Sequence, residues 1–268
     1  MSICVNVEST NPGQFFACCG LLELADRLWQ GAEGWFQNGQ FHVACRGTLD
    51  ELLAKLIRNP PKASTRLANG LPVKPLIAPL TLSFDGSATD VITLDAWMTV
   101  RIEKDEAVVT ANAPWNFWSG QQTSLRIWLA LQEALAEQLN VLDPDQFEGL
   151  FSHRVMLSGR FGFDPGAAWN ALDVGFSPNE QKLQVASSPS VELLAAVGIQ
   201  RFRPSMADDR QSFVYATWGR PLAPSVAAVA ASGMITVPPT QCFRGRVVSR
   251  GSYAALGHST LIRGESRE

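Results

Sequence analysis

Three large aromatic side chains share a short segment with several amide side chains at residues 112–123. The segment reads Asn-Ala-Pro-Trp-Asn-Phe-Trp-Ser-Gly-Gln-Gln-Thr and directly precedes a stretch with helical periodicity. Aromatic faces stack on nucleobases, amide side chains hydrogen-bond base edges, and a helix N-terminus attracts phosphate. The segment therefore predicts an RNA-contacting element that uses Trp115, Trp118, Gln121 and Gln122. The alternative, that at least two of its three aromatic rings fill the core, stays open.

Arginine is concentrated in the last quarter of the chain. Residues 1–200 carry 13 Lys and Arg against 21 Asp and Glu, a balance of −8, whereas residues 201–268 carry 9 against 4, a balance of +5. All nine of these later cations are arginine, whose planar fork binds phosphate oxygens and stacks on bases. An acidic partner subunit or a plain solvated surface would explain the same charges. Six of them are predicted to bind RNA: Arg201, Arg203, Arg210, Arg244, Arg246 and Arg250.

The sequence offers no convincing catalytic set. Cys18 and Cys19 are adjacent, and neighbours on a helix diverge by about 100°, so they do not face one site. There is no G-x-x-x-x-G-K-[ST] phosphate loop, no H-E-x-x-H and no C-x-x-C pair, so we predict no metal and no cofactor. His42, His153 and His258 are isolated from one another in sequence. Because one histidine can act as a general base in metal-independent RNA cleavage, an endoribonuclease stays an alternative.

Composition indicates a folded protein. The chain has 268 residues, of which 46% are hydrophobic and 18% charged, which is far from the composition of disordered proteins. No apolar run approaches the roughly 18 residues of a membrane span, and the N-terminus lacks the pattern of a secretory leader. The five cysteines are odd in number, which argues against a disulfide framework. We therefore expect a cytoplasmic protein with reduced thiols and no membrane partner.

Periodicity and capping signals predict the elements that would position these residues. In the first part, Asn11 or Thr10 caps a helix, Asn-Gly at 38–39 marks a tight hairpin, and Thr48 opens a capping box. The expected elements are a strand at 3–8, a helix at 12–29, hairpin strands within 35–43, a helix at 48–58, and strands at 80–84 and 91–94. This order is that of a ferredoxin-like β-α-β-β-α-β unit, and it predicts the α+β class.

The second half is expected to be more helical. Helices are predicted at 121–140, 190–199 and 224–232, and strands at 213–218 and 243–248. We expect residues 1–110 to form the ferredoxin-like unit. Residues 111–268 would form the second half, either as a separate domain or continuous with the first, since no clean linker divides them.

Six sequence blocks occur along nearly the whole chain in a recognisable order. They are NPGQFFACCGLLELA (11–25), LDAWM (94–98), WNFWSGQQ (115–122), GIQRFRP (198–204), YATW (215–218) and PLAP (221–224). In this order they resemble the small RAMP-type CRISPR-associated effector subunit of subtype I-G, formerly I-U, here called the Csb-three family. The blocks are descriptive and not catalytic signatures, so they support family membership better than mechanism.

The resemblance implies a protein built on ferredoxin-like (RRM/RAMP-type) units that associates with CRISPR RNA and other Cas subunits in antiviral defence. Some relatives cleave precursor guide RNA, but the glycine-rich loop typical of processing members is not clearly present, because Gly245, Gly251 and Gly257 are scattered. We therefore expect a non-catalytic subunit of a type I CRISPR-Cas effector complex. A metal-independent endoribonuclease for precursor CRISPR RNA and a purely structural adaptor are the alternatives. Indirect contact with target DNA is left open.

Overall fold

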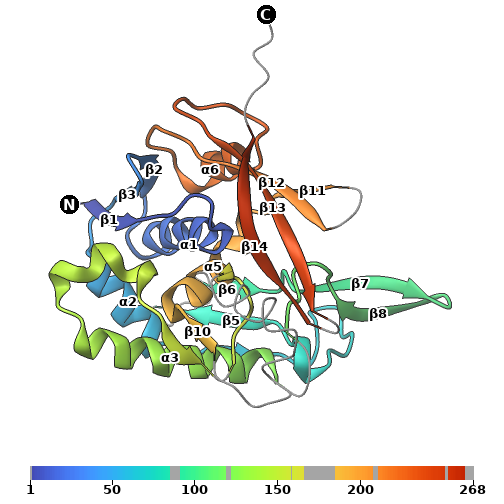
Figure 1. Ribbon diagram of the computed structural model, residues 1–268. Helices are drawn as coiled ribbons and strands as arrows, with labels where there is room; N and C mark the ends of the chain where they lie inside the picture. The colour runs from blue at the N-terminus through green and yellow to red at the C-terminus, as the bar shows by residue number, and fades with distance from the viewer. Residues whose placement is uncertain are drawn as a thin grey trace, which may run out of the picture.

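The fold is organised around α1 (Pro12–Trp29), the helix predicted from its cap at Asn11. The computed structural model describes residues 2–84, 91–118, 122–157, 159–165, 185–207, 211–250 and 253–262. The Asn11 side chain accepts a hydrogen bond from the Gln14 amide at 3.0 Å, and residues 12–25 are all buried. A helix that is covered all round lies inside a protein, and Figure 1 shows α1 enclosed by elements from both halves of the chain.

A small antiparallel sheet lies beside α1. Its strands are β1 (Ser2–Asn6), β2 (Glu33–Gln37) and β3 (Gln40–Ala44), in the order β1-β3-β2. Asn38 and Gly39 join β2 to β3 with φ of 51° and 76°, the left-handed values that a two-residue hairpin turn requires. α2 (Leu49–Arg58) then starts from the capping box of Thr48 and Glu51. The predicted hairpin and the predicted second helix are confirmed.

The next strands belong to a different sheet. β4 (Lys62–Ala63), β5 (Leu80–Ser83) and β6 (Val91–Leu94) pair in the order β4-β5-β6, and η1 (Pro75–Ile77) lies between β4 and β5 in the chain. The order β1-β3-β2 places the third strand between the first two, as in a split β-α-β arrangement. However, the strands expected to complete that unit pair with each other and with β4. The α+β class is confirmed, and the ferredoxin-like arrangement stays a prediction.

Among the described residues, the second half supplies three helices and most of the long strands. These elements are α3 (Ser124–Val141), η2 (Pro144–Ser152), β9 (Val155–Leu157), β10 (Val185–Ser187), α5 (Pro189–Arg201), β11 (Ser205–Met206), β12 (Ser212–Ala216), α6 (Pro224–Ala231), β13 (Cys242–Arg250) and β14 (Tyr253–Ile262). The helices and strands predicted here are confirmed to within a few residues. Buried apolar side chains from both halves form one continuous cluster. The expected division at residue 110 stays a prediction.

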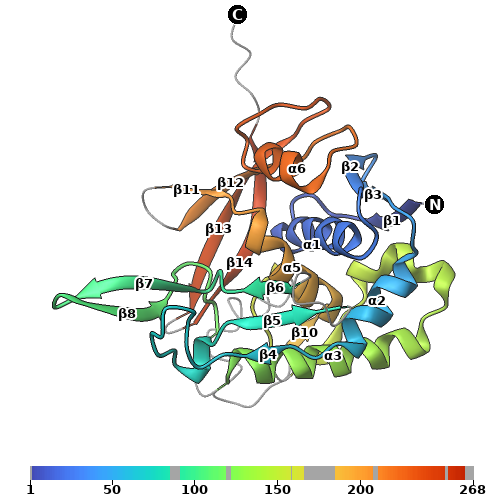
Figure 2. The same cartoon turned by 180° about the vertical axis from the view of Figure 1, so that it is seen from behind.

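A hairpin that was not predicted projects from the body of the molecule. Its strands are β7 (Met98–Glu103) and β8 (Glu106–Ala111), which pair along their whole length. Figures 1 and 2 show this two-stranded ribbon extending away from the helices. The turn at Lys104 and Asp105 has φ of 51° and 65°, the hairpin conformation without its usual Asn-Gly signature. The base of the hairpin joins the aromatic segment at 112–118.

α1 and α5 approach each other at backbone distance. A Cβ atom on Gly20 would lie 2.0 Å from the Leu194 carbonyl oxygen, and one on Gly198 would lie 2.0 Å from the Phe16 carbonyl oxygen. Both positions therefore need glycine for a steric reason, since any side chain would force the helices apart. Figure 2 shows α5 next to α1 in the middle of the fold. The two halves of the chain meet along this helix pair.

A buried polar cluster joins the N-terminal ends of the same two helices. Asp164 accepts a hydrogen bond from the Asn11 amide group at 3.4 Å and one from the Ser188 backbone N–H at 3.2 Å. Glu192, fully buried in α5, accepts the backbone N–H groups of Gly162 and Asp164, each at 2.9 Å. Burial raises the pKa of Glu192, while these amides and Arg160 favour its charged form. The cluster fixes where α1 and α5 begin.

The helix contact predicts a strong effect of one methyl group. Gly20→Ala should lower the free energy of unfolding by about 2–3 kcal/mol, because the new Cβ meets a backbone carbonyl that cannot move aside. Gly149→Ala is the matched control, since a Cβ there meets nothing within 4 Å. Chemical denaturation of both variants measures the difference. Equal midpoints for the two variants would contradict the close approach of α1 and α5.

Candidate nucleic-acid interface

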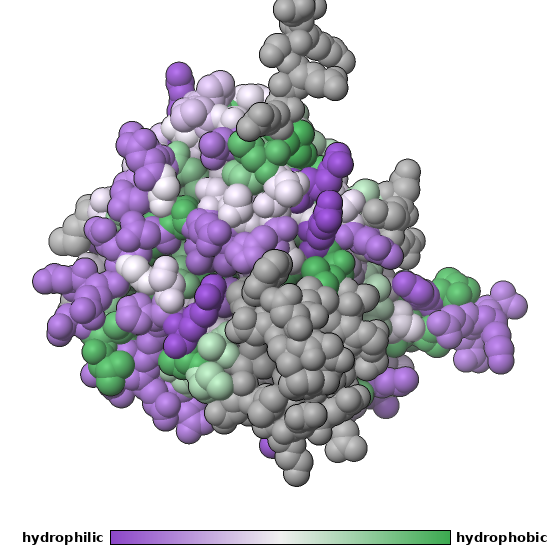
Figure 3. Space-filling model, in the orientation of Figure 1, coloured by the Kyte–Doolittle hydropathy of each residue, from purple (hydrophilic) through white to green (hydrophobic). Residues whose placement is uncertain are grey.

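The four-stranded sheet β11-β12-β13-β14 has one buried face and one open face. Phe213, Tyr215 and Phe243 point to the buried face, where Tyr215 lies 4.4 Å from Phe15 of α1 between ring centroids. Because side chains alternate across a strand, the residues between them point outward. Figure 1 shows β13 and β14 in front of the helices. In the same orientation, Figure 3 shows strongly hydrophilic side chains over this part of the molecule.

Arg244 and Arg246 stand on the open face of β13, and both are exposed. Arg244 pairs with Val214 of β12 on one side and with Thr260 of β14 on the other, while Arg246 pairs with Ser212 and Gly257. No carboxylate in the described part of the chain forms an ion pair with either arginine. Successive outward positions on a strand are roughly 7 Å apart. The two arginines therefore stand close together on β13, and the residues paired with them on β12 and β14 carry no charge.

The other two arginines that were predicted to bind RNA, and whose side chains are described, form ion pairs with carboxylates. Arg201 forms a two-point ion pair with the buried Glu23, with the second contact at 3.1 Å. This contact raises the pKa of Arg201, because Glu23 stabilises the charged guanidinium. Arg203 lies 3.4 Å from Asp95 in an exposed ion pair. Arg201 therefore ties α5 to α1, and neither side chain adds an unpaired charge to the sheet face.

Three predicted residues cannot be placed on this surface. Arg210 and Gln121 lie outside the described residues, and so does the side chain of Arg250 at the end of β13. Gln122 is described and half-buried. Its side chain lies against Gly159, where a Cβ atom would come within 2.9 Å of the Gln122 side-chain oxygen. Gln122 thus lies next to Gly159.

The aromatic segment is mainly part of the core. Trp115 is 5% exposed and packs against Phe16 and Phe213 with centroid distances of 6.1 and 5.5 Å. Phe117 is also buried. The core-filling alternative thus describes these two rings, and Trp115 presents no open face for a base. Trp118 is buried as well, at 8% exposed, but it also lines a surface pocket.

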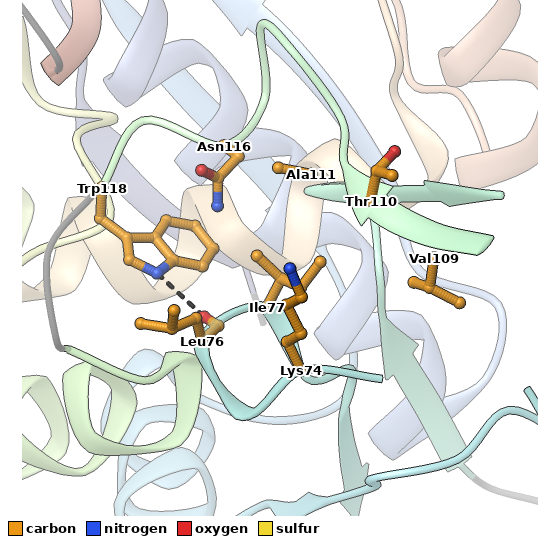
Figure 4. Close-up of a pocket in the computed structure, with 8 residues that line it drawn as sticks. All are labelled: Lys74, Leu76, Ile77, Val109, Thr110, Ala111, Asn116 and Trp118. Carbon is orange, nitrogen blue, oxygen red and sulfur yellow. Dashed lines mark hydrogen bonds between the residues drawn. The ribbon is translucent and has the colours of Figure 1, made fainter. Parts of the chain in front are cut away.

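The pocket next to Trp118 lies at the base of the β7–β8 hairpin (Figure 4). Its volume is about 360 Å³, and its walls come from three segments: η1 with the residue before it, the end of β8, and the aromatic segment. The eight lining residues are Lys74, Leu76, Ile77, Val109, Thr110, Ala111, Asn116 and Trp118. Sequence reasoning found Trp118 but missed the pocket, because the hairpin that forms one wall has no Asn-Gly turn.

Two of the thiols are fully buried, and two of the histidines have close side-chain neighbours. Within the described ranges no group of three or more His, Cys, Asp or Glu side chains could hold a metal ion. Burial raises the pKa of both Cys18 and Cys19 well above the usual value, so neither is a reactive thiolate. His42 stacks on Trp35, and His258 lies 3.8 Å from Glu8. His42 and His258 thus each have a close side-chain neighbour.

Comparisons with known proteins add no relative. The chain matches no protein-family model, no curated protein and no solved structure. Among the described residues, none of the helices has the length and apolar character needed to cross a bilayer. The family resemblance therefore rests on the six sequence blocks.

Burial predicts how the cysteines react. Iodoacetamide should label Cys4, Cys45 and Cys242, which are partly exposed, but should label Cys18 and Cys19 about a hundredfold more slowly. The cause is that alkylation needs a solvated thiolate, which the buried α1 positions lack. Mass spectrometry of peptides from native protein measures the rates, and labelling in denaturant is the control. Rapid native labelling of Cys18 or Cys19 would contradict the burial of α1.

Proposed function

We propose that the protein is a non-catalytic subunit of a type I CRISPR-Cas effector complex and contacts CRISPR RNA through the open face of the β11–β14 sheet. The observation that carries the RNA contact is the pair Arg244 and Arg246, which is exposed, adjacent and free of carboxylate partners among the described residues. The assignment to CRISPR machinery rests on the six sequence blocks and their order. Under this proposal, the β1-β3-β2 unit is a variant of the ferredoxin-like fold.

The chemistry of the sheet face suits a phosphate backbone. Arginine offers planar donors that grip phosphate oxygens in pairs, and binding releases counterions from the nucleic acid. The neighbours Val214, Ser212 and Thr260 carry no charge that would compete with phosphate for the guanidinium groups. An open antiparallel face also leaves the strand accessible along its length. These features favour backbone contact over recognition of a particular base.

Other charges of the chain favour docking on partners. The total charge is −3, so the protein does not attract nucleic acid over its whole surface. Two of the predicted RNA-binding arginines form ion pairs within the chain, Arg201 with Glu23 and Arg203 with Asp95. A local contact within a larger RNA-bearing complex fits this distribution better than a protein that coats RNA alone. Other Cas subunits are the partners that the proposal requires.

The arginine pair predicts a specific loss of RNA affinity. The double variant Arg244→Ala/Arg246→Ala should bind single-stranded repeat RNA about tenfold or more weakly at low salt. The slope of log affinity against log salt should also shrink by about 1.4, because each lost phosphate contact removes about 0.7. Fluorescence anisotropy over a range of salt concentrations measures both. Arg58→Ala/Arg126→Ala is the control, since it removes the same charge from α2 and α3.

Three outcomes would contradict the proposal. If the two double variants bound RNA with equal affinity, the sheet face would not be the RNA contact. A flat salt response of the parent would exclude phosphate contact altogether. Cleavage of repeat RNA by the parent in EDTA would favour the endoribonuclease, and His42→Ala, His153→Ala and His258→Ala would then identify the base.

A further inference from the structure

The pocket beside Trp118 is a site that the arginine surface does not explain. It opens between η1, β8 and the aromatic segment, and its volume of about 360 Å³ is at the small end for ligand pockets. The pocket has an aromatic wall, a largely apolar floor and a few polar groups. A site of this size admits one heteroaromatic ring with its sugar, and not two stacked ones.

The aromatic wall is held in place by its neighbours. The Trp118 indole N–H donates to the Leu76 carbonyl at 3.1 Å, so its single donor is already used. Trp97 and Phe161 pack against the indole at steep angles of 75° and 70°, with centroid distances of 5.4 and 5.3 Å. These contacts and the hydrogen bond hold the ring in place. The indole lines the pocket, and an indole is a group on which nucleobases stack.

Two polar atoms in the pocket wall have no hydrogen-bond partner. The side-chain nitrogen of Asn116 and the hydroxyl of Thr110 are buried and unpaired in the part of the chain that the structure describes. Figure 4 shows the Asn116 amide nitrogen turned toward the space between Trp118 and Ile77. Buried polar atoms are almost always paired, so an unpaired donor that faces a pocket indicates a missing acceptor. Carbonyl oxygens and ring nitrogens of a nucleobase are acceptors of this kind.

Lys74 adds a positive charge to the same pocket. Its side chain is exposed, and no carboxylate within the described ranges pairs with it. A lysine ammonium binds phosphate as a point charge. A purely apolar ligand would use Trp118 and Ile77 but would leave Asn116, Thr110 and Lys74 without a role. A nucleotide would use all of these groups.

We infer that this pocket binds a single ribonucleotide, with the base stacked on Trp118, hydrogen-bonded by Asn116 and Thr110, and with its phosphate near Lys74. This inference deepens the proposed function, since the nucleotide would be one unstacked base of the strand that the arginine face contacts. The pocket chemistry is the same for a free nucleotide. The two sources are separated by experiment.

The test combines free nucleotides with variants of the pocket. Protein labelled with 5-fluorotryptophan is titrated with AMP, GMP, CMP and UMP, and the ¹⁹F resonance of Trp118 is assigned from Trp118→Phe. At least one nucleotide should shift this resonance with saturation, and Asn116→Ala should weaken that binding about fivefold or more. Lys74→Ala should weaken the nucleotide but not its nucleoside, whereas Lys62→Ala, the control, should change neither. Inorganic phosphate should leave the resonance in place.

The outcomes separate this inference from the proposed function. The nucleotide site would be overturned if no nucleotide up to millimolar concentration shifted the Trp118 resonance and if Asn116→Ala and Thr110→Val left the RNA affinity unchanged. RNA binding through Arg244 would not be affected by that result. Nucleotide binding in the pocket without any RNA binding would support the pocket for a free nucleotide and overturn the proposed function. A weaker RNA affinity of both pocket variants would support the base of a bound strand. Equal shifts by inorganic phosphate would overturn recognition of a base.

Discussion

The backbone contact between α1 and α5 is the constraint on which the rest of the fold depends. Gly20 and Gly198 let the two helices approach until only backbone atoms separate them, and Asp164 and Glu192 hold their N-terminal ends together. The β1-β3-β2 sheet and the β11–β14 sheet each pack against the apolar surface of this helix pair. The arginines of β13 can face outward because Phe213, Tyr215 and Phe243 are buried on the opposite face of the same sheet, where Phe213 and Tyr215 pack against α1.

The same packing explains why charges with similar sequence contexts have different roles. Arg201 ends a buried helix, so its guanidinium reaches the buried Glu23 and connects α5 to α1. Arg244 and Arg246 alternate with buried residues on a sheet strand, so they are directed to solvent.

Trp115 and Trp118 also have different roles despite their similar sequence contexts. Trp115 enters the core between Phe16 and Phe213, whereas Trp118 is held by the Leu76 carbonyl at the edge of a pocket. Position in the fold, and not residue type, separates structural groups from candidate ligand-binding groups.

Local signals in the sequence predicted most of the elements, because caps and turns act over a few residues. Asn11, Thr48 and the Asn38-Gly39 turn each worked as expected. The β7–β8 hairpin was missed since its Lys104-Asp105 turn lacks the usual residues.

Long-range features could not be read from one sequence. Neither the contact of Gly20 with Leu194 nor the separate β4-β5-β6 sheet has a local signature, and the ion pair of Arg201 with Glu23 joins residues far apart in the chain.

The central claim is that the protein meets RNA at the sheet face that bears Arg244 and Arg246, which have no carboxylate partner among the described residues. Ultraviolet crosslinking tests it most directly, with guide RNA bound to the purified protein and the attached peptides identified by mass spectrometry. We expect crosslinked peptides from β12 to β14, including the segment around Arg244 and Arg246. Crosslinks confined to the opposite side of the molecule, for example to α2 and α3, or no crosslinks at all, would contradict it.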